Sequence, residues 1–524
     1  MRYRNIFLLS AMTLVVFLFS GCNLVVDDED HLPGDEFWTG PKENAEAFCL
    51  SIYNNLREAT IMESGLFFVS GDLRCAPITN LKTNDWMYMV TQNDMSGAKS
   101  KLDNGNWGVN NSTRWNFAAI YDWANFYKVI QGANILIREV DGMNSLSAEE
   151  KQGYKAEGVF LRNLTYFFLV RLFGDVPYYT DAYNATPLPR TPMLTVLHNC
   201  LNDMQTVLDA DPNAIALPWS NVPKRASRGS MLALMMHINM WLAQFDKVNK
   251  STYYQEVVRL AETNSWVTGD DYYHLVPIEQ TATLFKGGSS ESIFDIVQNI
   301  PSGEIFPARN MWSYYVVYEI FKRENPSCEY DVEFLQKLYP AEETDQRKIY
   351  WFNNMEYDED GNIITEKAVE ESTTLKQVHV EIVKELNEDA SSSQLIVNSG
   401  NYIVFRLADM ILLYAEALNN IGEIEKSLQQ LNRIRNRAGA TLVESASNLD
   451  DAIYWERVRE LMGEGQYFYD LVRTGKLCEM EYTLFGESGY RETKANFYQK
   501  SWTWPIANNS LINNPNVSKN NYWE

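Results

Sequence analysis

The sequence of 524 residues has few cysteines, few histidines and too little positive charge for several common classes of protein. Its six cysteines include no close pair and no Cys-x-x-Cys, which argues against a disulfide framework and a zinc site. We expect buried free thiols instead. Lys and Arg number 45 against 69 Asp and Glu, which gives a formal net charge of −24. Such a surface repels phosphate backbones and anionic lipids, so the composition argues against nucleic acid as a partner.

Sequence motifs of common enzymes are also absent. There is no His-Glu-x-x-His, no Gly-x-Ser-x-Gly and no Gly-rich phosphate-binding loop. The five histidines lack the spacing of metal ligands, and His237 lies in an apolar helical pattern that favours a hydrogen-bonded core residue. A pair of carboxylates for glycoside hydrolysis stays open, because such a pair is defined in space and not along the chain. We therefore predict no catalytic residue, no metal ligand and no cofactor, and expect a protein that is not an enzyme.

No stretch beyond the N-terminus is apolar enough to cross a membrane. At the N-terminus, two arginines precede an apolar run at residues 6–19, which is too short for a transmembrane helix but typical of a signal peptide. Ser20-Gly21-Cys22 follows and is similar to a bacterial lipobox, with Phe19 where Leu is commoner. We predict that residues 1–21 are a signal peptide and that Cys22 is acylated, because each buried CH₂ favours the membrane by about 0.8 kcal/mol. The alternative is an uncleaved signal anchor.

Residues 22–36 are acidic and show no periodicity, which predicts a tether between the lipid and the folded protein. Its acidic residues are explained either by a plain flexible linker or by an outward-export signal of surface lipoproteins. The full sequence is 45% hydrophobic and 13% aromatic, enough to bury a large core.

Apolar residues at i, i+3, i+4 and i+7 predict amphipathic helices along most of the chain. These helices cover residues 45–56, 113–140, 147–173, 191–208, 227–245, 252–263, 403–421, 424–438 and 449–462. Ser147-x-x-Glu150 forms a capping box at the start of one of them, and Gly174 marks its end. Two helix pairs with small residues at their contact positions, one before residue 264 and one after residue 401, resemble tetratricopeptide-type repeats. We expect a mainly α fold whose scaffold is made of tetratricopeptide-like helix pairs.

The helical pattern stops between residues 265 and 400, where Gly and Pro interrupt it and aromatic residues gather. Short strands and long loops are expected in this region, which we interpret as the ligand-binding part. Residues 357–364 predict a hairpin with its turn at Asp360-Gly361. A calcium loop that starts at Asp358 is disfavoured, because its sixth position is Ile363 where Gly is required.

Four stretches of the chain carry a further pattern. Residues 156–180 contain a helix that ends in Phe-Gly-Asp-Val-Pro, and residues 405–439 contain Arg-x-Ala-Asp, Tyr-Ala-Glu-Ala and Arg-x-Arg-Ala-Gly. Residues 456–473 contain Glu-Arg-x-x-Glu-Leu and Asp-Leu-x-Arg, and residues 504–523 contain Pro-Ile and Asn-Pro. In order and spacing these stretches resemble the SusD/RagB family of outer-membrane nutrient-binding lipoproteins, from about residue 37 to the end. One departure is Gln466-Tyr467, where a basic residue is common after Glu-Gly.

The charged residues of these motifs lie on or beside apolar helix faces. Charged side chains are rarely buried without a partner, so we predict that Asp409 or Glu416 meets Arg406, Arg433, Arg435 or another buried arginine. The predicted structural ion pairs involve Arg406, Asp409, Glu416, Arg435, Glu464, Asp470 and Arg473. The motifs therefore indicate how the helices pack together, and they do not show where a ligand binds.

A saccharide site needs exposed aromatic rings with polar groups around them, since the C–H faces of sugars pack on such rings. Aromatic residues outside the periodic helices are the candidates: Trp86, Trp107, Trp312, Tyr314 and Tyr315. Asp72 and Arg74, in a stretch from Ser70 to Arg74 that is typical of a loop, are the expected polar partners. The alternative for each tryptophan is a place in the core.

The resemblance implies a SusD-like domain at residues 37–524, with an N-terminal helical part (37–264), a loop-rich region (265–400) and a C-terminal helical part (401–524). It also implies an outer-membrane lipoprotein that faces the cell exterior and is held by its lipid only. Such a protein binds an oligosaccharide and delivers it, as a lid, to a SusC-like TonB-dependent transporter. A peptide-binding member of the family and a lid that binds no ligand remain open.

Overall fold

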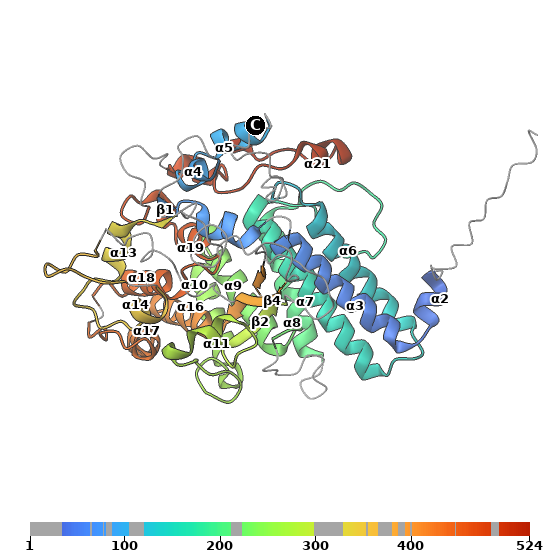
Figure 1. The fold of residues 1–524 in the computed structure, drawn as a ribbon. Helices are drawn as coiled ribbons and strands as arrows, with labels where there is room; N and C mark the ends of the chain where they lie inside the picture. The colour runs from blue at the N-terminus through green and yellow to red at the C-terminus, as the bar shows by residue number, and fades with distance from the viewer. Residues whose placement is uncertain are drawn as a thin grey trace, which may run out of the picture.

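The computed structural model describes residues 34–62, 65–76, 78–79, 86–103, 120–210, 223–297, 329–352, 355–364, 380–385, 394–398, 401–445, 447–483 and 492–524. In this part of the chain α-helices dominate, and their apolar faces meet in one continuous hydrophobic core (Figure 1). None of the helices in these ranges has the length and apolar character needed to cross a membrane. Residues 1–33, with the predicted signal peptide and Cys22, lie outside the described residues.

The N-terminal helices pack side by side around one long central helix. They are α2 (Gly34–Thr39), α3 (Lys42–Arg57), α6 (Ala124–Glu139), α7 (Ala148–Phe173) and α8 (Met193–Asp209). The central helix α7 is buried without interruption from Ala156 to Phe173, because α3, α6 and α8 all pack on it. The first helix, α2, begins within the range predicted to be a tether.

The predicted ends of α7 are confirmed. Ser147 Oγ accepts a hydrogen bond from the Glu150 backbone N–H at 3.1 Å, and the Glu150 carboxylate accepts one from the Ser147 N–H at 2.8 Å. These two bonds satisfy N–H groups that a helix N-terminus leaves free. At the other end, Gly174 has a φ of 70°, a conformation that residues with a Cβ rarely adopt.

The C-terminal half of the scaffold consists of helix pairs, as predicted. α9 (Arg228–Phe245) packs on α10 (Lys250–Glu262), α10 packs on α16 (Leu407–Asn420), and α16 packs on α17 (Ile424–Arg437). α18 (Leu449–Leu461) covers α16 and is followed by α19 (Tyr467–Thr474). The turn between α16 and α17 contains Gly422 at a φ of 87°. This stacking is the tetratricopeptide-like scaffold expected from the sequence.

The strands of the described chain form three antiparallel two-stranded sheets. β2 (Ser292–Ile296) pairs with β6 (Tyr402–Arg406), β1 (Ile78–Thr79) with β3 (Glu329–Tyr330), and β4 (Val380–Glu385) with β5 (Gln394–Asn398). The helix predicted from residue 403 is therefore wrong at its start, where residues 402–406 form β6. Four of these five residues are aromatic or β-branched, and they pair with β2 before α16 begins.

Short elements fill the region between the two halves of the scaffold. They are η5 (Thr263–Ser265), η6 (Ile278–Gln280), α11 (Thr281–Phe285), α13 (Val332–Leu338) and α14 (Arg347–Tyr350). The hairpin at residues 357–364 is confirmed, because Tyr357 bridges Ile363 and the Asp358 N–H donates to the Asn362 carbonyl at 2.8 Å. Gly361 in its turn has a φ of 83°.

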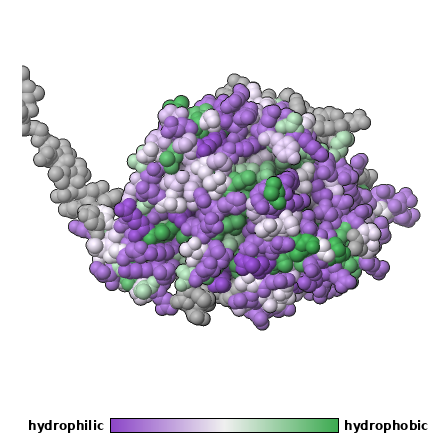
Figure 2. Space-filling model, turned by 180° about the vertical axis from the view of Figure 1, so that it is seen from behind, coloured by the Kyte–Doolittle hydropathy of each residue, from purple (hydrophilic) through white to green (hydrophobic). Residues whose placement is uncertain are grey.

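One side of the molecule carries elements from both ends of the chain. α4 (Trp86–Thr91), α5 (Met95–Asp103) and α21 (Asn508–Asn513) lie along it, away from α11 and α17 (Figure 1). α20 (Lys494–Tyr498), η9 (Lys476–Cys478) and η10 (Asn521–Trp523) complete the C-terminal segment. The opposite view shows a mostly hydrophilic surface on which hydrophobic residues form separate patches (Figure 2).

Two further expectations are settled by the fold. Cys49, Cys75 and Cys200 are free and buried, as predicted, and Cys478 is free and half-buried. The stretch from Ser70 to Arg74 is not a loop. It belongs to the π-helix η2 (Phe67–Leu73), which follows η1 (Glu58–Met62) and packs on α19.

Gly71 explains why this π-helix sits so close to its neighbour. A Cβ on Gly71 would lie 2.1 Å from the carbonyl oxygen of Gly465, so only glycine allows the two backbones to touch. We expect Gly71→Ala to lower the free energy of unfolding by about 1–3 kcal/mol, the usual cost of overpacking. Gly142→Ala is the control, because a Cβ at Gly142 meets nothing within 4 Å. Urea denaturation of both variants measures the difference, and equal midpoints would contradict the prediction.

Candidate functional site

The structure leaves most of the predicted ligand contacts outside the described residues. Trp107, Trp312, Tyr314 and Tyr315 fall there, and Trp86 begins α4 with a side chain that is not described. The structure does describe the strands that flank the segments holding Trp86 and Trp312. β1 precedes the connection to α4, and β3 follows residues 298–328. Because Ile78 pairs with Tyr330, the described ends that lead to Trp86 and to Trp312 lie next to each other.

Asp72 and Arg74 are inside the protein and not on an open loop. Arg74 is fully buried and donates to the carbonyls of Trp502 and Ser501 at 2.6 and 2.8 Å, and to Asn93 Oδ1 at 3.0 Å. Its guanidinium also lies 4.3 Å from the centre of the Phe468 ring. Asp72 accepts a hydrogen bond from the Gly465 N–H at 2.6 Å. This burial corrects the expectation of an exposed polar surface here.

Arg74 nevertheless bears on the candidate site, because it ties α4 to the C-terminal segment. Asn93 lies in the turn between α4 and α5, and the carbonyls that Arg74 binds belong to residues 501–503. The Cys75 N–H donates to the carbonyl of Val90 in α4. Burial lowers the pKa of Arg74, although an arginine stays charged at neutral pH in any case. Arg74 is therefore a positioning residue for the C-terminal end of α4 and the turn that follows it.

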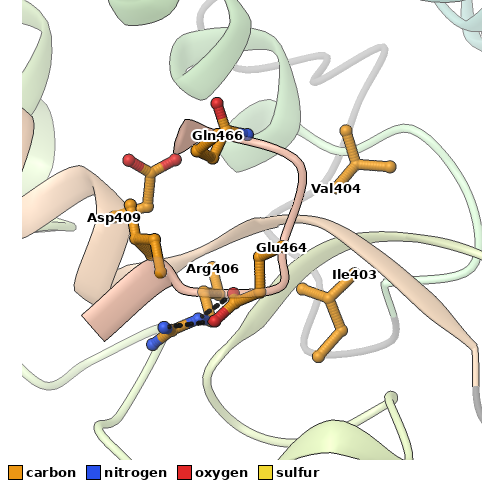
Figure 3. Close-up of a pocket in the computed structure, with 7 residues that line it drawn as sticks. Ile403, Val404, Arg406, Asp409, Glu464 and Gln466 are labelled. Carbon is orange, nitrogen blue, oxygen red and sulfur yellow. Dashed lines mark hydrogen bonds and ion pairs between the residues drawn. The ribbon is translucent and has the colours of Figure 1, made fainter. Parts of the chain in front are cut away.

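A small recess lies between β6, α16 and the turn after α18 (Figure 3). It is lined by Ile403, Val404, Arg406, Asp409, Leu461, Glu464 and Gln466, and its cavity volume is about 10 Å³. Its charged groups are already paired with one another or with the surrounding protein, as the dashed contact between Arg406 and Glu464 shows. Ligand pockets usually hold 300–1,000 Å³, so this recess is part of the packing and not a saccharide site.

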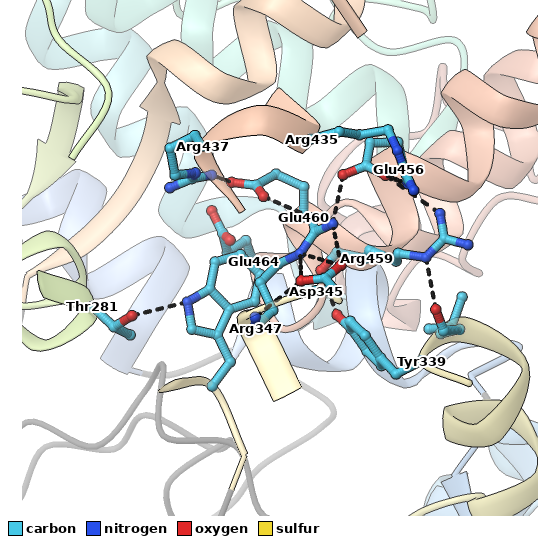
Figure 4. Close-up of polar contacts among 12 residues, drawn as sticks. Thr281, Tyr339, Asp345, Arg347, Arg435, Arg437, Glu456, Arg459, Glu460 and Glu464 are labelled. Atoms are coloured by element: carbon cyan, nitrogen blue, oxygen red, sulfur yellow. Dashed lines mark hydrogen bonds and ion pairs between the residues drawn. The ribbon is translucent and has the colours of Figure 1, made fainter. Parts of the chain in front are cut away.

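Arg406 and Glu464 of this lining belong to a larger buried network, which we call the Arg347 network (Figure 4). Its members are Glu291, Glu343, Asp345, Arg347, Arg406, Arg435, Arg437, Glu456, Arg459, Glu460 and Glu464. Arg347 in α14 binds Asp345 at 2.6 Å, Glu456 at 2.7 Å and Glu460 at 2.9 Å, and all four side chains are fully buried. Burial opposes the charge on Arg347, but the carboxylates hold its pKa well above the ordinary value.

Arg406, the last residue of β6, extends the network to the sheet. It binds Glu291 at 2.8 Å, Glu460 at 2.7 Å and Glu464 at 2.6 Å. Burial alone would raise the pKa of Glu456 in the same network, yet Arg347, Arg459 and Arg435 bring it below the usual value. Glu456 is therefore ionised, and each carboxylate of the network contacts at least one arginine.

A second chain of buried charges joins four helices, and we call it the Asp409 network. Its contacts run from His237 to Asp409 (2.8 Å), Asp409 to Arg457 (2.8 Å) and Arg457 to Asp470 (3.0 Å). They continue from Asp470 to Arg473 (2.7 Å) and from Arg473 to Glu416 (2.6 Å). Burial lowers the pKa of His237 despite its contact with Asp409, so the imidazole is neutral near pH 7.

The seven residues predicted to form structural ion pairs all lie in these two networks. Asp409 and Glu416 meet Arg457 and Arg473, and not Arg406, Arg433 or Arg435. Arg433 instead contacts the exposed Asp270 at 3.3 Å. Sequence reasoning missed Arg347, Asp345 and Glu291, because single charges in a region without periodicity give no sign of burial. Glu456, Arg457 and Glu460 were within a quoted motif, on one helix face at i, i+4 spacing.

Cys49 lies in the arrangement of polar groups that is most similar to a nucleophile with its partners. Its thiol is buried, with Arg225 Nη2 at 3.4 Å and the Glu157 carboxylate at 3.8 Å. Burial, followed by the negative charge of Glu157, raises the pKa of the thiol well above its ordinary value. A protonated, inaccessible thiol is inert, so this group of residues is structural.

Asp295 in β2 is a buried carboxylate without an arginine partner among the described residues. One of its oxygens accepts hydrogen bonds from the Gly288 N–H at 2.6 Å and from Asn401 at 3.4 Å. The other oxygen has no hydrogen-bond partner. Burial raises the pKa of Asp295 to about 7, although the hydrogen bonds lower it in part.

Because Asp295 is buried without an arginine partner among the described residues, we expect the free energy of unfolding to depend on pH in an unusual direction. Its pKa is higher in the folded than in the unfolded chain, so folding takes up a proton between about pH 4 and pH 7. The stabilising contribution is complete below pH 4 and is lost as the pH rises through 7. We expect Asp295→Asn to flatten this slope and to make the protein more stable at pH 8. Urea denaturation at pH 4.5, 6 and 8 tests this, and parallel pH profiles of wild type and variant would contradict it.

We expect truncation of the Arg347 side chain to cause a large loss of stability, because three buried carboxylates would lose the arginine that they share. We expect Arg347→Met to lower the free energy of unfolding by about 3–5 kcal/mol. The matched control is Arg259→Met, which removes the exposed pair with Glu256 and should cost less than about 1 kcal/mol. Thermal and urea unfolding measure both. A loss at Arg347 no larger than at Arg259 would show that the network adds little.

Comparison with known proteins shows the family to which this architecture belongs. The family model of the SusD family matches residues 311–523, and a model described as starch-binding associating with outer membrane matches residues 78–240. A SusD homolog from Bacteroides thetaiotaomicron of known structure is 43% identical, with a TM-score of 0.80 over 94% of this chain and 100% of that chain.

More distant relatives share the fold over similar lengths. NanU of Bacteroides fragilis is 19% identical, with a TM-score of 0.68 over 94% of this chain and 98% of that chain. SusD-like protein P38 of Formosa agariphila is 22% identical over 99% of each chain. The chain belongs to the SusD family, whose members are nutrient-binding proteins associated with the outer membrane and not enzymes.

Proposed function

We propose that this protein is a cell-surface lipoprotein that binds an oligosaccharide nutrient and delivers it to a TonB-dependent outer-membrane transporter. The observation that carries the proposal is the pairing of β1 with β3 on a rigid helical scaffold. This pairing joins the described ends of the segments that hold Trp86 and Trp312. Binding residues on loops that a rigid scaffold positions are the common arrangement in proteins.

The ion-pair networks supply the rigidity that this arrangement needs. The Arg347 network links α14, β6, α17 and α18, and the Asp409 network links α9, α16, α18 and α19. A scaffold fixed in this way keeps ordering costs low when a ligand binds, because only the loops have to adjust. The buried carboxylates of the two networks are all engaged in this task, which favours binding over catalysis.

The class of ligand follows from charge and chemistry. A chain with a net charge of −24 disfavours polyanions, whereas an uncharged saccharide contacts it through ring stacking and hydrogen bonds. The description of the second family model as starch-binding agrees with a saccharide. Acylation of Cys22 would hold the protein at the outer membrane, with residues 22–36 as its tether and residues 1–21 removed.

Substitution of the candidate tryptophans tests the proposal. We expect Trp86→Ala and Trp312→Ala each to weaken binding of a neutral oligosaccharide such as maltoheptaose, or whichever member of a glycan panel binds, by about tenfold. Calorimetry with the purified protein measures the affinity, and circular dichroism checks that helicity is unchanged. Val248→Ala is the control, because this exposed side chain lies in the turn between α9 and α10.

Each other outcome of this experiment points to a different function. Binding of peptides without binding of glycans would identify a peptide receptor, and no binding of either would leave a lid that contacts only the transporter. Hydrolysis of a glycan by the purified protein, abolished by one Asp or Glu substitution, would show an enzyme. Unchanged affinity in both tryptophan variants would remove these residues from the site.

A further inference from the structure

Asp295 joins three separate parts of the chain beneath an exposed turn. Its carboxylate accepts hydrogen bonds from the Gly288 N–H at 2.6 Å and from the Asn401 side chain at 3.4 Å, and its own N–H donates to the Pro223 carbonyl at 2.8 Å. The Asn401 N–H donates in turn to the Lys286 carbonyl at 2.9 Å. Asp295 is only 1% exposed, whereas Gly288 lies at the surface. The turn therefore separates the carboxylate from water.

Two consecutive glycines allow the turn to lie this close to Asp295. Gly287 and Gly288 have φ values of 84° and 72°, a region that other residues rarely adopt. A Cβ on Gly287 would lie 2.6 Å from the Asn401 Cβ and 2.8 Å from Asp295 Oδ2. Glycine also gains the most conformational freedom when it is released from a fixed structure. The turn is thus well suited both to close on Asp295 and to leave it.

No positive group neutralises Asp295 among the described residues. Its Oδ1 atom has no hydrogen-bond partner there. Lys224 and Lys286 are exposed, and the charge of Lys224 lowers the pKa of Asp295 by less than burial raises it. The other charged groups on the strand β2 and on the elements that pack against it have partners of their own: Glu291 with Arg406, Glu46 with Arg225, and His237 with Asp409.

The two protonation states of Asp295 therefore place different demands on the turn. A protonated carboxyl is neutral, and its burial beneath the turn costs little. An ionised carboxylate is a buried charge without a counter-charge, which is costly unless water reaches it. Water is nearest above Gly288, so the ionised group becomes hydrated when the turn moves away and its proton has passed to the solvent.

We propose that Gly287, Gly288, Asp295 and Asn401 form a pH-sensitive latch, which is shut while Asp295 carries a proton and opens at the glycine turn when the proton leaves. The latch joins the turn before β2 to the residue that precedes β6. The other end of this strand pair is held separately, because Ser292 pairs with Arg406. Opening therefore loosens one end of the sheet and leaves the Arg347 network in place. The inference does not depend on the proposed ligand or transporter.

The direction and size of the effect follow from linkage. Burial raises the pKa of Asp295 to about 7 in the closed latch, whereas a carboxyl in an open turn has a pKa of about 4. The closed form is thus favoured most strongly below pH 4, and its advantage is lost as the pH rises to 7. Between pH 6 and pH 8 the opening equilibrium should increase about tenfold.

Hydrogen–deuterium exchange of the purified lipoprotein at pH 6 and pH 8 tests the latch. After correction for intrinsic rates, we expect the protection of the Gly288 and Asn401 amides to fall about tenfold at pH 8. Urea below the unfolding transition should leave these two exchange rates unchanged, because a local opening exposes little surface.

The Asn362 amide is the control within the same molecule. It donates to the exposed Asp358 at 2.8 Å, and hydrogen bonds lower the pKa of that carboxyl, so its protection should be equal at pH 6 and pH 8. Unchanged protection at Gly288 and Asn401, or an equal fall at Asn362, would overturn the latch.

The variant Asp295→Asn shows which group carries the proton. Its amide oxygen accepts the same hydrogen bond from Gly288 but does not titrate, so we expect equal protection at pH 6 and pH 8. A fall as large as in the wild type would assign the effect to another group and contradict the proposal. The wild-type measurement decides the question by itself if this variant does not fold.

The competing device is an ion pair between Lys224 and the ionised Asp295, which would keep the turn shut. In that case the wild type stays protected at pH 8 and Lys224→Met does not, and the latch is wrong. If the latch is correct, Lys224→Met loses protection between pH 6 and pH 8 at least as strongly as the wild type.

Discussion

Three arginines converge on the single carboxylate of Glu460, and the arrangement of the scaffold depends on this contact. Arg347 comes from α14, Arg406 from the end of β6 and Arg437 from α17, while Glu460 itself lies on α18. A buried ion pair of this kind need not add stability relative to apolar residues, because removing charges from water is costly. It does require every partner to be present in one geometry. The sheet and the helices around it are therefore held in one relative position, and the loops at their edges start from fixed points.

In the Asp409 network three carboxylates share two arginines, and a further arginine nearby balances the remaining negative charge. Asp409, Asp470 and Glu416 face only Arg457 and Arg473 through ion pairs. Arg171 of α7 lies nearby with its guanidinium 3.7 Å from the centre of the Tyr469 ring. The positive charges of Arg457 and Arg171 add to the effect of burial and lower the pKa of His237. The core is thus close to neutral, and the large acidic excess of the chain resides on its surface.

The sequence revealed the helices and the presence of buried charge, but not which charges meet. Asp409 and Glu416 could be recognised as buried because they sit among apolar residues at helical spacing. Their partners Arg457 and Arg473 are some fifty residues away, and only the packing of α18 and α19 on α16 selects them. The same limit explains the errors at β6 and at η2. Residues 402–406 pair with β2 more than a hundred positions earlier, and η2, which includes Ser70 to Leu73, packs on α19 and lies close to Gly465, nearly four hundred positions later.

The candidate ligand residues were the hardest to place from sequence, because an aromatic residue in a loop has the same local pattern whether it binds a sugar or fills the core. Asp72 and Arg74 show the difficulty, since they carry the right chemistry and are nevertheless buried. Arg74 joins Asn93, in the turn after α4, to residues 501–503, more than four hundred positions later in the chain, and Asp72 binds the backbone of Gly465. Through the contacts of Arg74 the C-terminal end of α4, the helix that begins with Trp86, is tied to residues 501–503.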